Sequence, residues 1–317
     1  MNKEKFVMFT SFFQGIDSIR NEFSSYAALT NAANGFADYY EKSYKENIFG
    51  KIDDECIMIN PDTGKVKITR SKNKTSLKYK APELIKNTHI RDNTDSDNFT
   101  LAVLLFRLFF IDHPFEGSSD LSVAPFLTKK VCELLYGYEP VFVYSPSNNS
   151  NKPLSNLSPY LVSRWSKTPQ PLKDAFTQTF TDGINDTKAR LSPEQWKHII
   201  NKIMDTGVFI DGQLYLADPD NLSALPTECV IIEINSRKIV IADGGRLIVS
   251  YGEKTTPLCA DIFVRDNQNI LSFENITDDT WIIYRKDGAE EYIQPSEKAC
   301  LTSGDSIDFG SEIGKML

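Results

Sequence analysis

The stretch SDNFTLAVLLFRLFFIDHPFEG, residues 96–117, contains the most apolar run of the 317-residue chain. This run is too short to span a bilayer and it contains Arg107, so it predicts a buried core helix over Phe99 to Ile111. An Asp or a Ser is available to cap the start of this helix. The proline and glycine of DHPFEG end it. We therefore expect a core helix here, not a membrane segment.

Three further helices are predicted on either side of this stretch. Apolar residues at spacings of three and four predict a helix over residues 22–44. Shorter helices are expected near residues 171–181 and 192–204. The second of these opens with Ser192 as the cap and a proline at the first helical position.

A hairpin and a long loop complete the helical part of the chain. Two short β-like runs, at residues 56–60 and 65–69, are joined by Pro-Asp-Thr-Gly, which is typical of a tight turn. Residues 138–171 are rich in Pro, Ser and Asn, which limits regular structure to short pieces. We interpret this segment as a long ordered loop.

The sequence changes character after Asp205. Short β-rich runs such as ECVIIEI, RKIVIA and TWIIYRK follow one another, separated by polar or glycine turns. This pattern is typical of a β-sandwich or barrel. We expect an α+β chain of two domains, a mostly α-helical domain over residues 1–205 and an all-β sandwich over residues 206–317.

Composition excludes several classes of protein. Lys and Arg total 35 against 43 Asp and Glu, and a net charge of -8 argues against broad binding of nucleic acid. No apolar stretch approaches the length of a membrane span. The five cysteines are widely spaced and form no CxxC pair, which argues against a disulfide framework or a zinc site and favours the cytoplasm.

The order of several motifs gives residues 1–205 a resemblance to the C-terminal lobe (C-lobe) of a protein kinase. Ala81-Pro82-Glu83 matches the motif that closes the activation segment of kinases. Asp97 matches the aspartate of the central helix that braces the catalytic loop, and HPFEG matches the turn after that helix. Arg190 lies where kinases place the arginine that pairs with the motif's glutamate. The resemblance implies structural roles for Glu83, Asp97 and Arg190.

The same resemblance implies a degenerate catalytic site. Lys51 stands in place of the catalytic aspartate, Cys56 in place of the metal-binding asparagine, and Arg70 in place of the DFG aspartate. Cations at such positions repel Mg²⁺, and a protonated lysine cannot accept a proton. KFVMF resembles the hinge strand, and no glycine-rich loop or VAIK-type lysine precedes it. We expect no metal, no cofactor and no ATP-binding lobe.

Lys51 and Arg70 could bind an anion in the former cleft. A salt bridge with nearby acids is the interpretation that we favour. The run Asp53-Asp54-Glu55 could hold a metal, although consecutive acids in a polar loop are more often solvated.

Residues near the C-terminus resemble the closing half of a forkhead-associated (FHA) domain, a β-sandwich that binds phosphothreonine. The matching residues are Asn275, Leu301, Gly304, Asp305, Ile307 and Gly310. Upstream, TTPLCAD lacks the histidine of the family's binding motif, and Gly245-Arg246 does not clearly match the Gly-Arg pair. We favour a docking sandwich, with Arg246, Arg265 and Asn275 as candidate phosphopeptide-binding residues.

These observations together predict a bacterial pseudokinase that acts as a protein-binding scaffold in phospho-signalling. The resemblance implies a kinase, a phosphatase or a von Willebrand-type domain protein as partner. Two alternatives stay open, a phosphothreonine-binding module and an atypical nucleotide-dependent kinase. The phenylalanines that would face the missing lobe are expected to need cover from the sandwich, a second copy or a partner; they are Phe6, Phe9, Phe12 and Phe13.

Overall fold

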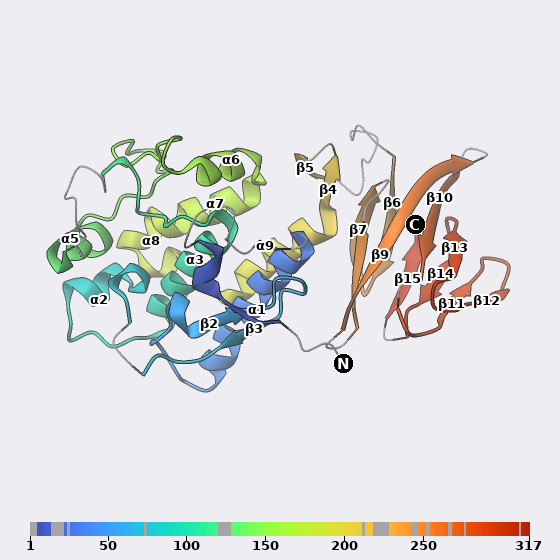
Figure 1. Ribbon diagram of the computed structural model, residues 1–317, viewed down its shortest axis with the longest axis horizontal. Coiled ribbons are helices and arrows are strands. Elements are labelled where there is room, and N and C mark those ends of the chain that lie inside the picture. The colour runs from blue at the N-terminus through green and yellow to red at the C-terminus, as the bar shows by residue number, and fades with distance from the viewer. Residues whose placement is uncertain are drawn as a thin grey trace. The chain divides into compact units, whose positions relative to one another are not determined.

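The chain is an α+β protein in which a helical N-terminal region precedes a C-terminal region with a six-stranded antiparallel sheet (Figure 1). The computed structural model describes residues 5–13, 22–23, 26–72, 75–119, 128–210, 213–217, 228–242, 246–251, 254–265, 268–275, 277–310 and 312–317. The chain divides into two compact units, Met1–Ile200 and Asn201–Leu317. We predicted a boundary at residue 205. Within the described residues, no helix is long and apolar enough to cross a bilayer.

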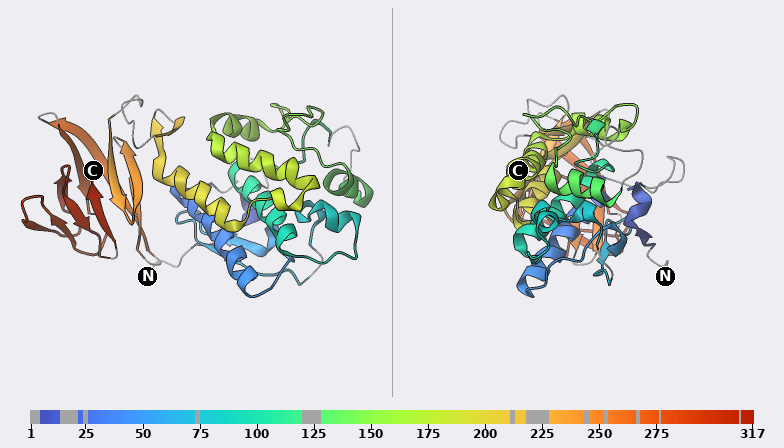
Figure 2. Two further views of the ribbon diagram at one scale, coloured as in Figure 1. Left: turned by 180° about the vertical axis from the view of Figure 1, so that it is seen from behind. Right: turned by 90° about the vertical axis from the view of Figure 1, so that its left-hand side faces the viewer.

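The helices of the N-terminal unit lie close to their predicted positions. Those predicted are α1 (Tyr26–Lys45), α3 (Thr94–Phe110), α7 (Gln170–Phe180) and α9 (Pro193–Thr206). The described residues also form α2 (Pro82–Lys86), α5 (Lys129–Glu133), α6 (Pro159–Lys167) and α8 (Asp182–Asn185). Helix α3 lies between α1 on one side and the pair α6 and α7 on the other (Figures 1 and 2).

Helix α3 forms the centre of the core because its apolar residues are buried all around the helix. The ring of Phe106 meets the rings of Phe176 and Phe180 on α7 edge-on, with centroids 5.2 and 5.9 Å apart. Such edge-to-face pairs add to the stabilisation that burial provides.

The start of α3 is capped by Asn93, not by the Asp or Ser that we predicted. The side-chain oxygen of Asn93 accepts hydrogen bonds from the backbone N–H groups of Asp95 and Ser96, at 2.9 and 3.1 Å. Ser96 returns the bond, because its Oγ accepts from the backbone N–H of Asn93 at 2.9 Å. This reciprocal capping box satisfies amide groups that the first turn leaves free.

The predicted hairpin is present and belongs to a three-stranded sheet. Strand β2 (Ile57–Ile59) pairs with β3 (Val66–Ile68) and also with β1 (Val7–Met8), both antiparallel. Gly64 closes the turn with a φ of 73°, and a Cβ there would lie 2.0 Å from the backbone oxygen of Ala28. The turn therefore requires glycine, both for its backbone conformation and for its contact with α1.

Two of the four phenylalanines expected to need outside cover are buried and contact aromatic rings of their own unit. Phe9 meets Phe36 of α1 edge-on with centroids 5.5 Å apart, and Phe12 stacks on Phe23 at 4.7 Å. The expectation of an outside partner for Phe9 and Phe12 was wrong, because the segment folds back onto α1.

The other two phenylalanines are half-buried and lie against cations. The Nζ of Lys67 lies 3.7 Å from the ring centre of Phe6, and the guanidinium of Arg107 lies 3.6 Å from that of Phe13. Cation–π contacts of this kind favour keeping both rings on the surface of the unit.

The C-terminal unit contains two larger antiparallel sheets and the small pair β4 (Gly207–Ile210) and β5 (Gln213–Leu216). The six-stranded sheet has the order β12-β11-β14-β15-β6-β7 and the four-stranded sheet the order β13-β10-β9-β8. Their strands are β6 (Cys229–Ile234), β7 (Arg237–Ala242), β8 (Arg246–Tyr251), β9 (Lys254–Arg265), β10 (Gln268–Glu274), β11 (Trp281–Tyr284), β12 (Glu290–Ile293), β13 (Lys298–Leu301), β14 (Ser306–Asp308) and β15 (Ile313–Met316).

Both sheets contribute side chains to one hydrophobic cluster. Leu271 and Leu301 come from the four-stranded sheet, and Ile232, Trp281 and Ile307 come from the six-stranded sheet. All five are at most 1% exposed. Burial on this scale is the main source of stability of a β domain.

Candidate functional site

The candidate site is the loop that joins α1 to β2, because all three predicted degenerate positions lie in it or bond to it. The carboxylate of Asp97, in the first turn of α3, accepts the backbone N–H of Gly50 with both oxygens, at 3.0 and 3.1 Å. Asp97 is 2% exposed. Asp97 therefore joins the first turn of α3 to this loop.

Two consecutive residues with positive φ set the path of this loop. Gly50 has a φ of 69° and Lys51 has a φ of 63°. A Cβ at position 50 would lie 2.4 Å from the carboxyl carbon of Asp92, so glycine is required there. The side chain of Lys51 is exposed.

Arg70 binds backbone carbonyls of the same loop. Its guanidinium donates to the backbone oxygens of Ile48, Phe49 and Gly50 at 2.9, 3.0 and 2.7 Å. A salt bridge with nearby acids was our favoured interpretation. The described contacts differ because the loop presents a row of carbonyls within reach of the guanidinium. Arg70 thus joins β3 and the segment after it to the loop through three hydrogen bonds.

Cys56 is buried under the loop, and its thiol donates to a side-chain oxygen of Asp53 at 3.2 Å. Burial raises the pKa of the Cys56 thiol to about 11, so the thiol stays protonated at neutral pH. A protonated thiol is neither a nucleophile nor a metal ligand. In this structure Cys56 acts as a hydrogen-bond donor to Asp53.

The acidic run Asp53-Asp54-Glu55 is not the solvated loop that we predicted. Asp53 is 5% exposed, and Asp54 forms a salt bridge of 2.9 Å with Arg107 on α3. Of the three acidic residues, only Glu55 is exposed. The prediction failed because α3 supplies a cation to this loop from inside the core.

Arg107 also contacts Tyr79, whose hydroxyl accepts a bond from the guanidinium. Sequence reasoning noted Arg107 only as an argument against a membrane span. A buried cation in an apolar helix requires hydrogen-bond acceptors. This requirement could have indicated from the sequence that Arg107 bonds to polar side chains of other segments. Arg107 joins α3 to two segments that are far apart in the sequence.

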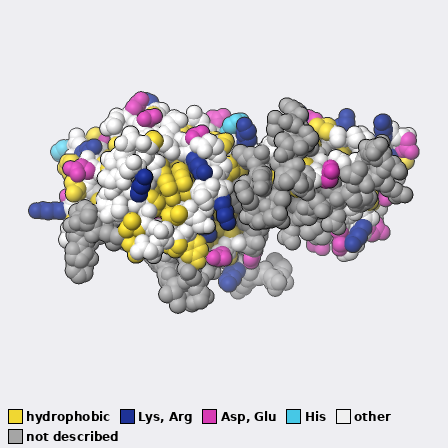
Figure 3. Space-filling view, turned by 90° about the horizontal axis from the view of Figure 1, so that it is seen from above, with side chains coloured by type: hydrophobic (Ala, Val, Ile, Leu, Met, Phe, Trp, Pro, Cys, Tyr) yellow, Lys and Arg dark blue, Asp and Glu magenta, His cyan; other side chains and the backbone are white. Residues whose placement is uncertain are grey.

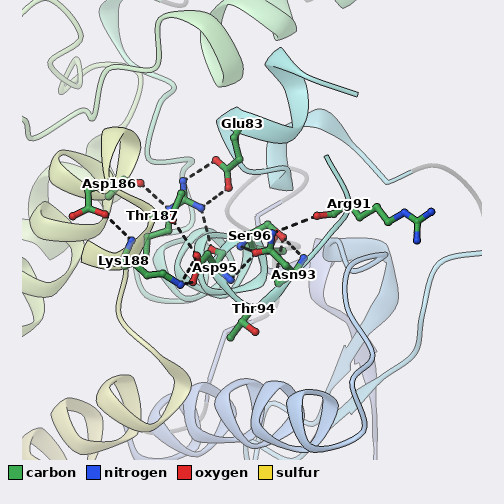
Figure 4. A network of polar contacts seen from close by, with 12 residues as sticks. Glu83, Arg91, Asn93, Thr94, Asp95, Ser96, Asp186, Thr187 and Lys188 are labelled. Atoms are coloured by element: carbon green, nitrogen blue, oxygen red, sulfur yellow. Dashed lines mark hydrogen bonds and ion pairs between the residues drawn. The ribbon is translucent and has the colours of Figure 1, made fainter. Parts of the chain in front are cut away.

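Glu83 and Arg190 meet as the resemblance implied. The guanidinium of Arg190 donates to both carboxylate oxygens of Glu83, at 2.7 and 2.8 Å, and its side chain is 0% exposed. It also donates to the backbone oxygens of Gly183 and Asp95, at 2.7 and 3.0 Å. This pair lies beside the first turn of α3, where Lys188 bonds to Asp95 (Figure 4).

Asp97 has a raised pKa with a predictable consequence for stability. Burial raises the pKa of Asp97 from its usual 3.8 to about 7, aided by Asp92 and opposed by the Gly50 bond and Arg70. The folded protein therefore holds the Asp97 proton at pH values where the unfolded chain has lost it. The stability that this proton contributes is complete below about pH 4 and is lost as the pH rises through 7.

We expect Asp97→Asn to flatten the pH dependence of the unfolding free energy of the N-terminal unit between about pH 4 and 7. The slope removed is at most about 1.4 kcal/mol per pH unit. Burial lowers the pKa of His113 to about 4, and His113 acts in the opposite direction. Both proteins keep His113, so the difference between them isolates Asp97. Equal slopes in urea titrations at several pH values would contradict this assignment.

Of the candidate phosphopeptide residues, Asn275 is enclosed by its own turn. Asn275 is 0% exposed, and its amide donates to the backbone oxygens of Asp279 and Ile293 while its oxygen accepts from Thr277. The structure therefore gives Asn275 a structural role in place of the predicted binding role, because the surrounding turn uses its whole amide group. The side chains of Arg246 and Arg265 lie outside the described residues.

Among the described residues, no group of three or more His, Cys, Asp or Glu side chains could hold a metal ion. The sequence matches no known protein family and no curated protein.

Proposed function

We propose that the N-terminal unit is a kinase-like C-lobe without phosphoryl-transfer chemistry and that the chain acts as a protein-binding scaffold. The observation that carries the proposal is the position of Arg70. Phosphoryl transfer needs hard oxygen ligands for Mg²⁺ at this place. Under the proposed correspondence Arg70 stands at this place, and its guanidinium donates to three carbonyls of the loop.

Two bonds support the kinase-like part of the proposal. Glu83 and Arg190 form a bidentate pair across more than a hundred residues of sequence. Asp97 braces the loop through Gly50. Both bonds stabilise the fold without contributing to catalysis, which is what a scaffold that has lost its activity would retain.

For the C-terminal unit we propose an FHA-like sandwich used for docking. Its support is the segment that ends the chain, where Gly304 and Gly310 have φ values of 95° and 94° and Leu301 and Ile307 are fully buried. Asp305 joins this segment to the turn between β11 and β12, because it accepts from the backbone N–H groups of Thr302 and Lys286. The buried position of Asn275 favours docking over phosphothreonine recognition.

The first test is binding of nucleotide by the full chain. We expect no change in melting temperature with ATP or GTP in the presence of Mg²⁺ or Mn²⁺, since no side chain at the three degenerate positions offers an oxygen ligand. A catalytically active kinase in the same buffers is the control. Transfer of radioactive phosphate from ATP that Lys51→Ala abolishes would overturn the proposal.

The second test concerns the partner. Affinity purification of the full chain from its native cell is expected to recover one protein in near-stoichiometric amount. A kinase, a phosphatase or a von Willebrand-type domain protein is the class that the proposal favours. Recovery of nucleic acid or of a small-molecule substrate in place of a protein would contradict a scaffold.

A further inference from the structure

The long segment before α6 is held in place by buried side chains. Phe142 and Val143 are each 1% exposed, and the buried amide of Asn151 donates to the backbone oxygens of Phe115 and Val141 at 2.9 and 2.7 Å. Long ordered loops with little secondary structure are usually functional. The proposed function makes no use of this one.

This segment exposes two leucines on one turn. Leu154 is 38% exposed and Leu157 is 57% exposed. The backbone oxygen of Leu154 accepts from the N–H groups of Leu157 and Ser158 at 2.9 and 2.8 Å, so the backbone that carries both leucines forms a hydrogen-bonded turn. Figure 3 shows hydrophobic side chains gathered on this side of the N-terminal unit, over α6 and the loop before it.

The charges of this segment all have one sign. Residues 140–173 contain Lys152, Arg164, Lys167 and Lys173 and no acidic residue. Lys152 and Lys167 are exposed, and Lys and Arg border the hydrophobic area in Figure 3. We call the surface formed by Lys152, Leu154, Leu157 and Lys167 the α6 face. Its chemistry suits an acidic partner that also offers an apolar side chain.

The edge strand β12 of the C-terminal unit has the complementary chemistry. It ends the order of the six-stranded sheet and pairs with β11. Tyr292 is 56% exposed, and its neighbours Glu290 and Glu291 are also exposed. Acidic residues protect an edge strand from pairing with other strands but leave it able to bind a basic surface.

The two halves of the chain differ in charge in the same sense. Residues 201–317 contain 10 Lys and Arg against 20 Asp and Glu. Residues 1–200 contain 25 Lys and Arg against 23 Asp and Glu. The acidic C-terminal half and the cation-only segment at α6 therefore attract one another when they belong to different molecules.

We propose that the α6 face binds the acidic edge of β12 on a second copy of this chain. Tyr292 of one copy packs on Leu154 and Leu157 of the other. Glu290, which lies on the same face of β12 as Tyr292 and accepts from its hydroxyl, faces Lys152 and Lys167. Glu291 points to the opposite face of the strand and pairs with Arg285 of its own unit. The two surfaces differ, so the contact is heterologous and generates open chains or a ring, not a symmetric dimer. This self-association does not depend on the kinase-like assignment.

Sedimentation velocity of the full chain at rising concentration tests this proposal. The mean mass is expected to increase with concentration at low salt and to decrease when salt screens the charges. Lys152→Glu with Lys167→Glu gives one variant, and Glu290→Lys gives the other. Each variant alone is expected to be a monomer. An equal mixture is expected to associate again, because each reversed surface then meets its complement on the other variant.

The mixture also controls for folding, since two misfolded variants would not restore each other. Leu154→Ser with Leu157→Ser is expected to weaken association at least tenfold while leaving the melting temperature unchanged. A wild-type chain that stays monomeric at every concentration would overturn the proposal. So would a mixture that associates no more than its components, or a monomer that binds vesicles of anionic lipid through the α6 face.

Discussion

Replacing Arg190 by methionine lowers the free energy of unfolding of the N-terminal unit by about 3–5 kcal/mol. The guanidinium is completely buried and donates to Glu83, Gly183 and Asp95. Methionine fills part of the volume but leaves the carboxylate of Glu83 without its buried partner. Breaking such a pair costs more than the pair contributes, because an uncompensated charge remains.

Urea unfolding followed by far-ultraviolet circular dichroism measures this loss. The helical signal reports on the N-terminal unit, because every described α-helix begins in that unit. Lys188→Ala is the matched control, because Lys188 bonds to Asp95 in the same network but its side chain is 79% exposed. Exposed pairs contribute about 0–1 kcal/mol. Equal losses in the two variants would show that the buried pair is not what holds this region together.

Replacing Asp305 by alanine lowers the free energy of unfolding of the C-terminal unit by about 3 kcal/mol. Asp305 is 2% exposed and accepts four hydrogen bonds at 3.0 Å, from the backbone N–H groups of Thr302 and Lys286, the hydroxyl of Thr302, and Arg285. Alanine leaves these donors without an acceptor. Two turns that the carboxylate joins then lose their common anchor.

The matched control is Asp287→Ala, because Asp287 is exposed and accepts from the backbone N–H of Ala289 in the neighbouring turn. We expect it to cost about 0.5–1 kcal/mol. Burial raises the pKa of Asp305, but the bonds from Thr302, Lys286 and Arg285 outweigh this and lower it below 3.8. The contribution of Asp305 is therefore present above that pH and is lost as the pH falls through the lowered pKa. An Asp305→Ala variant as stable as Asp287→Ala would refute the anchoring role.

Elements with a strong periodic pattern could be predicted from the sequence. The helix at α3 and the strands β6, β7 and β11 follow apolar runs whose spacing requires one face or all faces to be buried. The strands β12, β13 and β15 were missed. Their sequences EEYI, KACL and IGKM are short and carry charged residues, so their pairing depends on neighbours that only the folded sheet provides.

For the candidate site, the sequence predicts the chemical character of the side chains but not the hydrogen bonds that they form. The residue types at Lys51, Cys56 and Arg70 already disfavour Mg²⁺, because none of the three side chains offers the oxygen ligand that Mg²⁺ requires. The partners of those side chains could not be predicted. Arg70 reaches three carbonyls and Cys56 reaches Asp53 because the loop bends at Gly50 and Lys51.

The sequence by itself determined the division into a helical part and a β part, and the absence of a carboxylate at Lys51, Cys56 and Arg70. Periodicity and residue chemistry carry both, and neither depends on long-range contacts. Only the tertiary structure decided that Phe9 packs on α1, that Arg107 pairs with Asp54, and that Asn275 is enclosed by its own turn. A hydrogen bond or an ion pair exists only where folding brings donor and acceptor within about 3 Å, and sequence separation gives no measure of that distance.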